Sequence, residues 1–373
     1  MSRALSTRGP VLVIGTGLIG TSIALALRSA KVDVYLSDTS PTSLSLAADM
    51  GAGVSLVEID NPDPSLVVVA APPDVAADCV LDALSKYPNA VVTDVASVKT
   101  AVETAVEKTG TDTQLPRYVG SHPMAGRSRS GASYAVADLF YGQPWVIVPT
   151  SKSDPVATLT VRNLAVDLGA IPIDMGPEDH DLAVAYVSHV PQLVASLLAA
   201  RLLEADAHAM DLAGQGLRDT TRIAASDPRL WTAIIAGNAE PIAAVLDDIG
   251  QDLAHLTERL RGHSEGQAGA VGVISEIMTA GNRGRSRIPG KHGGAQRRWG
   301  EVEVLVPDRP GELARLFGDV GSANINIEDL ALEHAAGRRF GIATLMVDPA
   351  DQLVAVAELE ERGWRVINAG VVG

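Results

Sequence analysis

One histidine occupies the position that most strongly suggests chemistry. It lies in the run Gly120-Ser121-His122-Pro123-Met124-Ala125-Gly126, where a glycine ends an apolar stretch and a proline begins a turn. An imidazole exchanges protons near neutral pH, so a histidine held in this way can act as an acid or a base. The competing interpretation is a tight loop with a polar tip and no chemical role.

A second segment has the glycine spacing of a dinucleotide-binding turn, Gly15-Thr16-Gly17-Leu18-Ile19-Gly20. Gly15 permits a tight turn after a strand, Gly17 lets the backbone approach a pyrophosphate, and Gly20 allows a helix to pack closely on that strand. The helix predicted to begin at Leu18 directs free amide groups and the positive end of its dipole toward phosphate. We therefore assign Gly15, Gly17, Leu18, Ile19 and Gly20 to a cofactor site.

Asp38 follows the next predicted strand, at the separation expected for the acid that binds the adenosine ribose. Its carboxylate would accept hydrogen bonds from the ribose hydroxyls and repel a 2′-phosphate, and no arginine stands beside it. The sequence therefore predicts NAD rather than NADP as the cofactor. Pro72, in a rigid bend after the apolar run 66–70, is expected to line the same crevice. The alternatives are a flavin or nucleotide-sugar site, or a related fold that binds no cofactor.

The elements that must position these residues alternate between strand and helix. Apolar runs predict strands at residues 11–14, 32–36, 66–70, 90–93, 117–120 and 145–148, with a helix at 18–27. This rhythm is typical of an α/β, doubly wound, Rossmann-type sheet. Alanine- and leucine-rich helices then extend to about residue 280. The predicted division is 1–174 for the sheet domain, 175–281 for a helical substrate and dimerisation domain, 282–299 for a glycine-rich linker, and 300–373 for a small α+β unit.

Three further motifs follow in a fixed order. They are Thr93-Asp94-Val95-Ala96-Ser97-Val98-Lys99, then Ser188-His189-Val190-Pro191, and then the segment from Arg218 to Trp231. Together with the glycine turn and the His122 run, this ordered set resembles the prephenate/arogenate dehydrogenase family of tyrosine biosynthesis. The resemblance covers most of the first 280 residues.

The resemblance implies an NAD-dependent oxidative decarboxylation of prephenate to 4-hydroxyphenylpyruvate. Hydride and CO₂ leave opposite sides of the ring, and aromatisation supplies much of the driving force. The resemblance also implies that His122 is the catalytic base for the C4 hydroxyl, and that Ser97 orients His122 or the substrate. Ser97 is equally suited to be the N-cap of a helix beginning near Val98. Lys99 would serve the cofactor or the fold, and Asp94 would end its strand.

The family's substrate site implies roles for three other residues. Arg222 is our choice for binding the substrate carboxylate, because a guanidinium can do so with two hydrogen bonds; the alternative is a surface ion pair with Asp219. His189 would touch the substrate or would be a core histidine. Gln192 stands where many members carry a second histidine, often those that use prephenate. Arogenate dehydrogenase therefore remains open as the alternative.

The C-terminal unit resembles an ACT domain, through the runs Val306-Pro307-Asp308-Arg309-Pro310-Gly311-Glu312-Leu313-Ala314 and Asn324-Ile325-Asn326-Ile327-Glu328. A helix is predicted at 313–321, a second strand carrying both asparagines, a last helix at 352–361 and a closing strand at 364–368. The resemblance implies an amino-acid effector site, with tyrosine the natural effector, at Asp308, Pro310, Gly311, Leu313, Asn324 and Asn326. The alternative is a structural or dimerising appendage.

Composition limits the remaining possibilities. The net charge of −15 argues against nucleic acid as a partner. It also requires local cations, such as Arg127 or Arg129, to attract an anionic substrate. The single cysteine fits a reducing cytoplasm. No apolar run is expected to be long enough to span a membrane, and no residues show metal-ligand spacing. We expect a cytoplasmic homodimer; a non-catalytic sensor that binds NAD and an amino acid is the rival from another class.

Overall fold

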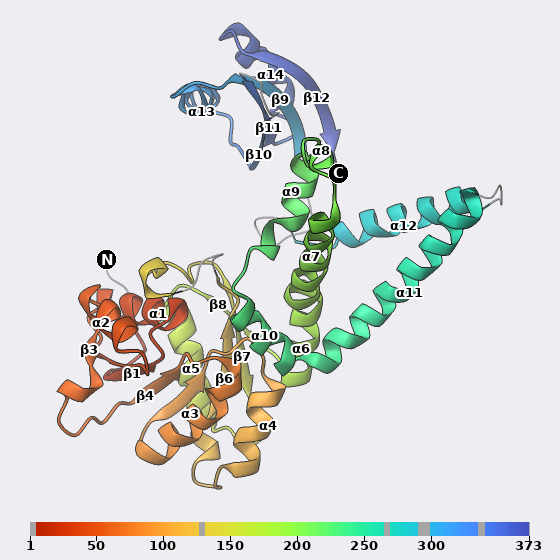
Figure 1. Ribbon diagram of the computed structural model, residues 1–373. Helices are drawn as coiled ribbons and strands as arrows, with labels where there is room; N and C mark the ends of the chain where they lie inside the picture. The colour runs from red at the N-terminus through yellow and green to blue at the C-terminus, as the bar shows by residue number, and fades with distance from the viewer. Residues whose placement is uncertain (1–4, 127–130, 265–268, 290–298, 335–339, 373) are drawn as a thin grey trace. The chain divides into compact units, whose positions relative to one another are not determined.

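The structure is a computed structural model that describes residues 5–126, 131–264, 269–289, 299–334 and 340–372. Two compact units make up the chain. The first comprises Met1–Glu204 and Thr221–Ile249, and the second comprises Ala205–Thr220 and Gly250–Gly373. Figure 1 shows the elements in the order in which they follow along the chain.

The first unit is built around a five-stranded parallel sheet with the strand order β3-β2-β1-β4-β5. The strands are β1 (Val11–Ile14), β2 (Val34–Ser37), β3 (Val54–Ser55), β4 (Leu66–Val69) and β5 (Val91–Asp94). The valine-rich sequences of β1 and β4 suit strands covered on both faces. The predicted Rossmann-type doubly wound sheet is present.

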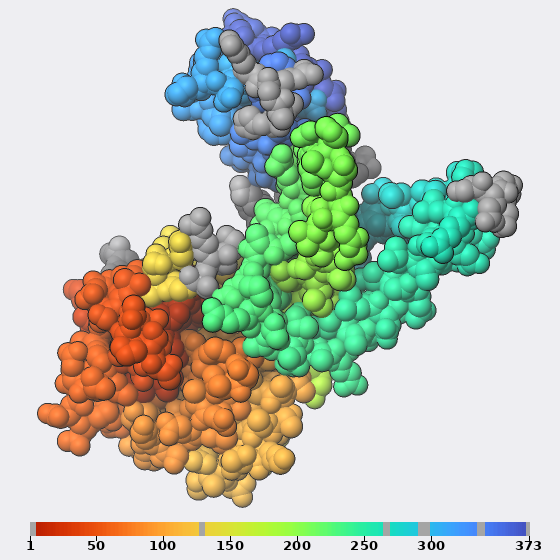
Figure 2. All heavy atoms as spheres, in the orientation of Figure 1, coloured from red at the N-terminus to blue at the C-terminus, as the bar shows by residue number. Residues whose placement is uncertain are grey.

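Helices cover both faces of this sheet. Val11 and Val13 of β1 pack in one core with α1 (Leu18–Ser29) and α2 (Pro41–Asp49). Leu12, between them, points into a second core with α3 (Pro73–Lys86) and α4 (Thr100–Thr109). Because successive strand residues point to opposite faces, one short apolar run fills both cores. Figure 2 shows the residues coloured red to yellow packed together as one body.

The strands after β5 do not extend the parallel sheet as predicted. The strands β6 (Val119–Pro123), β7 (Pro144–Pro149) and β8 (Ile171–Asp174) form a separate three-stranded sheet, with α5 (Pro155–Asp167) between β7 and β8. β6 runs antiparallel to β7, and β7 runs parallel to β8. One isolated parallel bridge joins Val92, within β5, to Tyr118, the residue just before β6. His122 therefore lies on a strand just beyond the edge of the parallel sheet.

The helical part of the first unit begins with α6 (Pro177–Val184). A π-helical turn, Ala185–His189, follows, and α7 (Val190–Arg201) continues from it. After Thr221, a short 3₁₀ turn (Arg222–Ala224), α10 (Pro228–Gly237) and the start of α11 (Ala239–Ser264) complete this unit. Ile234 of α10 lies in the same core as α3 and α4, so this helix packs directly on the parallel-sheet region.

The expectation that no apolar segment is long enough to span a membrane is wrong. The continuous helical segment Pro177–Glu204 reaches that length and hydropathy, with a mean hydropathy of 1.6 in its most apolar window. Residues 182–200 contain no Asp, Glu, Lys or Arg, so no charge interrupts this apolar run. Length and composition alone do not separate a membrane span from the core helix of a folded domain.

The second unit contains short helices α8 (Ala207–Met210) and α9 (Gln215–Thr221), the remainder of α11, α12 (Ala270–Arg285) and a C-terminal sheet. α12 extends to Arg285, so it includes the first residues of the predicted linker. Residues 290–298 of that linker, and Arg127 and Arg129, lie outside the described residues.

The C-terminal sheet is antiparallel, with the order β10-β11-β9-β12. Its elements are β9 (Trp299–Pro307), α13 (Glu312–Ser322), β10 (Asp329–His334), β11 (Phe340–Val347), α14 (Gln352–Glu361) and β12 (Arg365–Val372). This strand–helix–strand–strand–helix–strand order is the ferredoxin-like topology. The prediction that a strand carries Asn324 and Asn326 is wrong, because β10 begins at Asp329. Asn324 has a φ of 57°, which belongs to a turn and not to a strand.

Candidate active site

The glycine turn after β1 has the geometry that a dinucleotide requires. Gly15 has a φ of 96°, and a Cβ there would lie 2.4 Å from the carbonyl oxygen of Ala70. A Cβ at Gly20 would lie 1.9 Å from the carbonyl oxygen of Gly15, so α1 packs against the turn too closely for alanine. A Cβ at Gly17 would meet nothing within 4 Å, so space is open where a pyrophosphate would approach.

The start of α1 offers donors to that space. The first bond along the helix runs from the Thr21 amide to the Gly17 carbonyl, at 3.0 Å. The amide groups of Leu18, Ile19 and Gly20 precede it and point out of the helix end, where a phosphate can accept from them. Ile19 also packs against the core below, which holds this first turn in place. These residues fit a bound dinucleotide.

Asp38 lies directly after β2 and holds the glycine turn by its carboxylate. Its Oδ2 accepts hydrogen bonds from the amide and the hydroxyl of Thr16, at 2.6 and 2.8 Å. Its Oδ1 accepts from the Ser40 amide at 2.7 Å. Asp38 is therefore oriented toward the turn, as a ribose-binding acid would be. Pro72 is exposed and precedes the first residue of α3, beyond the end of β4.

His122 is half-buried on β6, and its ring nitrogen is engaged by a second histidine. His122 Nδ1 lies 2.9 Å from Nε2 of His180, with the two rings edge to face at 5.1 Å between centroids. Desolvation holds the pKa of His122 well below its usual range, and the nearby His180, Lys99 and His189 lower it further. The imidazole is therefore neutral near pH 7, as a general base must be.

Asp181 anchors the second histidine and begins α4 at the same time. Its Oδ1 lies 2.8 Å from His180 Nδ1 and accepts from the Lys99 amide, and its Oδ2 accepts from the Thr100 amide. Burial alone would raise the pKa of this carboxyl, but the hydrogen bonds from His180, Lys99 and Thr100 outweigh it and lower the pKa. Asp181 thus supplies the anionic cap that the amide groups at the start of α4 need.

Ser97 does not supply that cap. The helix begins at Thr100 and not near Val98, and no side chain of the preceding residues bonds to its first amides. Among the described residues, no hydrogen bond of the Ser97 side chain was found, and none joins it to His122. The N-cap interpretation of Ser97 is wrong, and its predicted role beside the substrate stays a prediction.

A buried ion pair stands behind His122. The Lys99 ammonium and the Asp94 carboxylate form a contact with almost no exposed surface on either side chain, and Lys99 also donates to the Ser121 carbonyl at 2.8 Å. The Tyr118 hydroxyl donates to the second oxygen of Asp94 at 2.8 Å. These bonds tie the end of β5, at Asp94, to Tyr118 and to β6 at Ser121. In the structure, Lys99 and Asp94 therefore hold the strand that carries His122.

His189 is buried at the end of the π-helical turn, a conformation that often marks functional sites. Asn238 Nδ2 lies 3.0 Å from His189 Nδ1 and donates to the Asp181 carbonyl at 2.8 Å. The ring of Trp231 meets the His189 ring edge to face. Desolvation lowers the pKa of His189 to about 4; Asp181 opposes this shift and His180 adds to it.

The structure leaves two predicted substrate residues less well defined. Gln192 is buried and makes only long contacts of 3.4 Å, with Ser196 and Ser226. Arg222 is exposed, in the 3₁₀ turn that packs on α7. No ion pair of Arg222 was found among the described residues, and the Asp219 carboxylate accepts from Gln215 at 2.7 Å. Arg222 is thus open to a ligand, but no contact joins it to His122.

His180, Asp181 and Asn238 are the residues that the sequence reasoning missed. His180 lies in none of the motifs that the sequence analysis singles out. The adjacent His-Asp pair was the available signal, since an imidazole beside a carboxylate is a common arrangement for orienting a ring. No comparable signal marks Asn238, because its role depends on the start of α11 meeting α6.

The predicted effector residues lie in the C-terminal sheet region. Asp308 and Pro310 are exposed in the turn after β9, and Gly311, with a φ of 93°, precedes the first residue of α13. Leu313 packs on the core of this sheet. Asn324 is exposed, and Asn326 donates to Glu328 at 2.6 Å. The Glu312 amide donates to the Arg309 carbonyl at 3.3 Å, and the amides of Leu313 and Ala314 precede the first bond along α13, so these two could bind a carboxylate.

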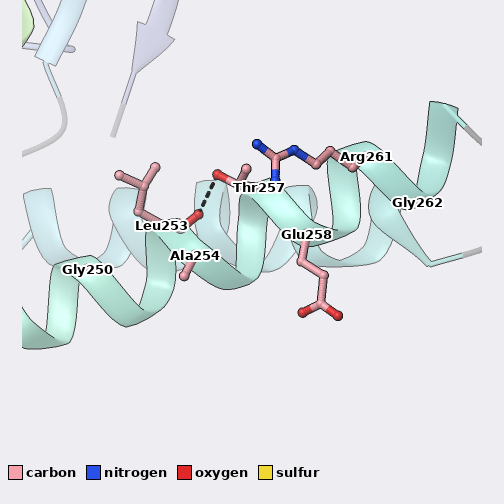
Figure 3. Close-up of a pocket in the computed structure, with 7 residues that line it drawn as sticks. All are labelled: Gly250, Leu253, Ala254, Thr257, Glu258, Arg261 and Gly262. Atoms are coloured by element: carbon pink, nitrogen blue, oxygen red, sulfur yellow. Dashed lines mark hydrogen bonds between the residues drawn. The ribbon is translucent and has the colours of Figure 1, made fainter.

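Two other features of the molecule contribute no residues to this site. Within the described residues, no group of three or more His, Cys, Asp or Glu side chains could hold a metal ion. A shallow hollow lies along α11, lined by Gly250, Leu253, Ala254, Thr257, Glu258, Arg261 and Gly262. Figure 3 shows that these residues all come from one helix, with the Thr257 hydroxyl donating to the Leu253 carbonyl.

Comparisons with known proteins agree with the geometry of the first unit. The family profile "Prephenate dehydrogenase, nucleotide-binding domain" matches residues 23–173, and "Prephenate dehydrogenase, dimerization domain" matches residues 176–270. The probable prephenate dehydrogenase NovF of Streptomyces niveus is 37% identical over 358 residues, which is 95% of this chain and 98% of that protein.

Two solved structures are similar over most of the chain. Prephenate dehydrogenase from A. aeolicus, in complex with hydroxyphenyl propionate and NAD⁺, has a TM-score of 0.65 and 30% identity, covering 75% of this chain and 99% of its own. Synechocystis arogenate dehydrogenase has a TM-score of 0.59 and 27% identity, covering 74% and 99%.

Proposed function

This chain belongs to the prephenate dehydrogenase family, and from that premise we propose that it catalyses the oxidative decarboxylation of prephenate. The cofactor is NAD, as the glycine turn and Asp38 indicate. The products would be 4-hydroxyphenylpyruvate, CO₂ and NADH. The observation that carries the proposal is His122, a neutral imidazole anchored through one nitrogen, in a chain with a complete dinucleotide turn.

The residues of the site divide the work of this reaction. Bound NAD supplies the acceptor for the hydride that leaves C4. His122 would take the proton of the C4 hydroxyl as that oxygen becomes a carbonyl. Loss of the ring carboxylate as CO₂ then aromatises the ring to a phenolate, and the proton returns from His122 to that oxygen to give the phenol. The Lys99–Asp94 pair keeps β6, and hence His122, in position. Arg222 and His189 are our candidates for binding the substrate's carboxylate and side chain, with Gln192 beside them.

The choice between prephenate and arogenate rests on Gln192. Its amide can accept a hydrogen bond from the ammonium group of arogenate and can donate one to the keto group of prephenate. The similar structures include an enzyme of each name. NADH formation measured with each substrate in turn tests the function and its specificity together. We expect a higher kcat/KM with prephenate; a higher value with arogenate would make this chain an arogenate dehydrogenase.

A non-catalytic sensor is the rival function from another class. Such a protein would bind NAD and an amino acid but form no NADH with either substrate. The intact and anchored His122 argues against this, because ligand binding alone does not require a neutral base. The same assay decides, provided that NAD binding to the sample is shown by calorimetry.

We also propose a homodimer formed through the helical segment. The profile for the dimerization domain covers α7 and α11, and both helices expose large apolar side chains. Leu197 of α7 is 63% exposed and Leu253 of α11 is 60% exposed. Apolar rows of this kind are usually covered by a partner. Light scattering should give twice the mass of the chain, 38.8 kDa; a monomer at micromolar concentration would contradict the proposal.

The C-terminal sheet is proposed to be an ACT domain that binds an amino acid, with tyrosine the candidate. Support comes from its ferredoxin-like order and from the amides of Leu313 and Ala314, which precede the first bond along α13 and follow the turn of Asp308, Pro310 and Gly311. A typical allosteric coupling is ~1–3 kcal/mol, or about 5–150-fold in affinity. A chain ending after residue 289 keeps α12 and should keep activity while losing tyrosine inhibition. Equal inhibition of both chains would place tyrosine at the active site instead.

A further inference from the structure

The contacts behind His122 determine which of its two nitrogens is free to act. We propose that Asp181 and His180 form a relay that holds the proton of neutral His122 on Nδ1, leaving Nε2 as the base. Both residues would be positioning residues, since neither is proposed to touch the substrate. The inference rests on the proposed role of His122 and extends it to two residues to which nothing else assigns a part in catalysis.

The first link of the relay is the Asp181 carboxylate, which can act only as a hydrogen-bond acceptor. The Asp181 carboxylate already accepts hydrogen bonds from the amides of Lys99 and Thr100, at 2.8 and 2.9 Å. The hydrogen bonds from these two donors and from His180 outweigh burial and lower its pKa, so the carboxylate is ionised and able only to accept. His180 Nδ1, at 2.8 Å, must therefore carry a hydrogen. In the neutral ring, Nε2 of His180 then has a lone pair and no hydrogen.

The second link follows from the first. His122 Nδ1 lies 2.9 Å from that Nε2, so a hydrogen bond forms only if Nδ1 of His122 carries the hydrogen. Neutral imidazole has one N–H, so Nε2 of His122 is left with a lone pair. Without this constraint the hydrogen would distribute over both nitrogens, and part of the enzyme would present N–H to the substrate hydroxyl where a base is required.

The same chain can accept the charge that the reaction creates. When Nε2 of His122 takes the hydroxyl proton, the ring becomes a cation whose Nδ1–H still donates to His180. If that Nδ1 proton moves to His180 Nε2, the cation lies on His180, against the Asp181 carboxylate. No proton is lost in either arrangement. Lys99 is the nearest fixed cation facing this group, and its charge is already paired with Asp94.

Asn238 keeps the relay apart from the other buried histidine. Its Nδ2 must face the Asp181 carbonyl, because the reversed amide would set two oxygens against each other. The second hydrogen of that nitrogen points to His189 Nδ1, which must therefore accept. His189 thus carries its hydrogen on Nε2, the opposite tautomer to His122. One protein thereby holds two neighbouring histidines in two different proton arrangements.

The test compares His180→Phe with His180→Gln in the full-length enzyme. Phenylalanine keeps the ring shape and removes both nitrogens, so we expect kcat to fall by about 10²-fold while KM for NAD and for prephenate change little. Glutamine places an oxygen near the position of Nε2 that can accept from His122, so kcat should return to within roughly tenfold of wild type. His208→Gln, at a fully exposed histidine, is the matched control and should have no effect.

A direct reading of the proton does not depend on turnover. Nitrogen-15 NMR of histidine-labelled protein distinguishes N–H from bare nitrogen at each ring position, and His122→Asn identifies the signals of His122. Wild type should show hydrogen on Nδ1 of His122, and His180→Phe should show it mainly on Nε2. Hydrogen on Nε2 in the wild type, or a charged His180, would overturn the relay.

These readouts also separate this inference from the proposed function. If the NMR result is as expected but His122→Asn retains turnover, the relay stands and His122 is not the base. If His180→Phe fails to fold, the wild-type spectrum and the kcat of His180→Gln still decide. A merely structural His180 would lower thermal stability in both variants and leave the His122 tautomer unchanged.

Discussion

The glycine turn and the His122 cluster differ in whether their polar groups are paired. The His122 cluster comprises His122, His180 and Asp181, with Thr100 and Asn238 beside them. At the turn, three amides at the start of α1 have no partner within the helix, and Gly17 faces open space. In the His122 cluster, both nitrogens of His180 and both oxygens of Asp181 are engaged within the protein. A site for a charged ligand keeps donors open, because the ligand will satisfy them. A site that moves one proton pairs the groups that fix that proton, even though the Asn238 Oδ1 nearby has no partner among the described residues.

The difference also appears in where the residues come from. The turn is one continuous segment with a single distant partner, Asp38, which is 22 residues from Thr16. The cluster joins residues from β6, α6, the start of α4 and the junction of α10 and α11, and the contact between His122 and His180 spans 58 residues. A change in the turn should therefore act locally on NAD, while a change in the cluster should act on kcat. The following experiments test that separation.

The largest effect is expected from His122→Asn. Removing the base should lower kcat by ~10²–10⁴-fold, the usual span for general-base catalysis, with NAD affinity unchanged. Steady-state kinetics and calorimetry with NAD measure the two quantities. His208→Asn, on an exposed histidine, is the control. Near-normal turnover by a folded His122→Asn protein would remove this histidine from the mechanism.

Arg222→Ala should give the next largest effect. It should raise KM for prephenate and leave KM for NAD and kcat unchanged. Losing a hydrogen bond to a charged carboxylate costs about 1.5–3 kcal/mol, so KM for prephenate should rise roughly 10–100-fold. Arg229→Ala, another exposed arginine just downstream, provides the matched control. An unchanged KM for prephenate would mean that Arg222 is an exposed surface residue that does not bind the substrate.

Asp38→Ser combined with Thr39→Arg should shift the preference from NAD toward NADP by about tenfold, which corresponds to roughly 1.4 kcal/mol. The shift is expected because the carboxylate no longer repels the 2′-phosphate of NADP and the new arginine can pair with it. Because Asp38 also holds Thr16, we expect weaker binding of both cofactors. The ratio of kcat/KM for NADP to that for NAD is the measurement. Asp33→Ser at the other end of β2 controls for loss of charge. A wild type that already prefers NADP would contradict the assignment.

The smallest effect is a shift of the pH profile of kcat/KM toward lower pH. The pKa of His122 lies well below its ordinary value of 6.5, so the base stays unprotonated and kcat/KM should hold constant as the pH falls to 6.5. Activity should be lost only at lower pH, as His122 takes up a proton. A pH profile of kcat/KM for prephenate at saturating NAD gives the midpoint. A midpoint above 6.5 would mean that the surroundings stabilise the charged ring instead.

Local patterns were readable in the sequence, and long-range contacts were not. The positions of Gly15, Gly20 and Asp38 follow from one turn and two strands, so spacing alone located them. Ser97 failed as a helix cap because Asp181, 82 residues beyond Lys99, takes the amides at the start of α4. No local rule favours that distant carboxylate over a nearby hydroxyl. His180 was missed for the same reason, since its contact with His122 exists only because α6 lies against β6.

Asp181 both caps the start of α4 and holds His180. The rate at which activity is lost on heating should therefore depend on this one small region of the chain. The Lys99 and Thr100 amides can exchange hydrogen with water only when the Asp181 carboxylate lets them go, and the same event releases His180. Such local openings require less free energy than unfolding of the whole chain. Inactivation on heating should therefore follow the exchange rate of these two amides and precede global melting. Substitutions that strengthen a distant part, such as the C-terminal sheet, would raise the melting temperature without prolonging activity.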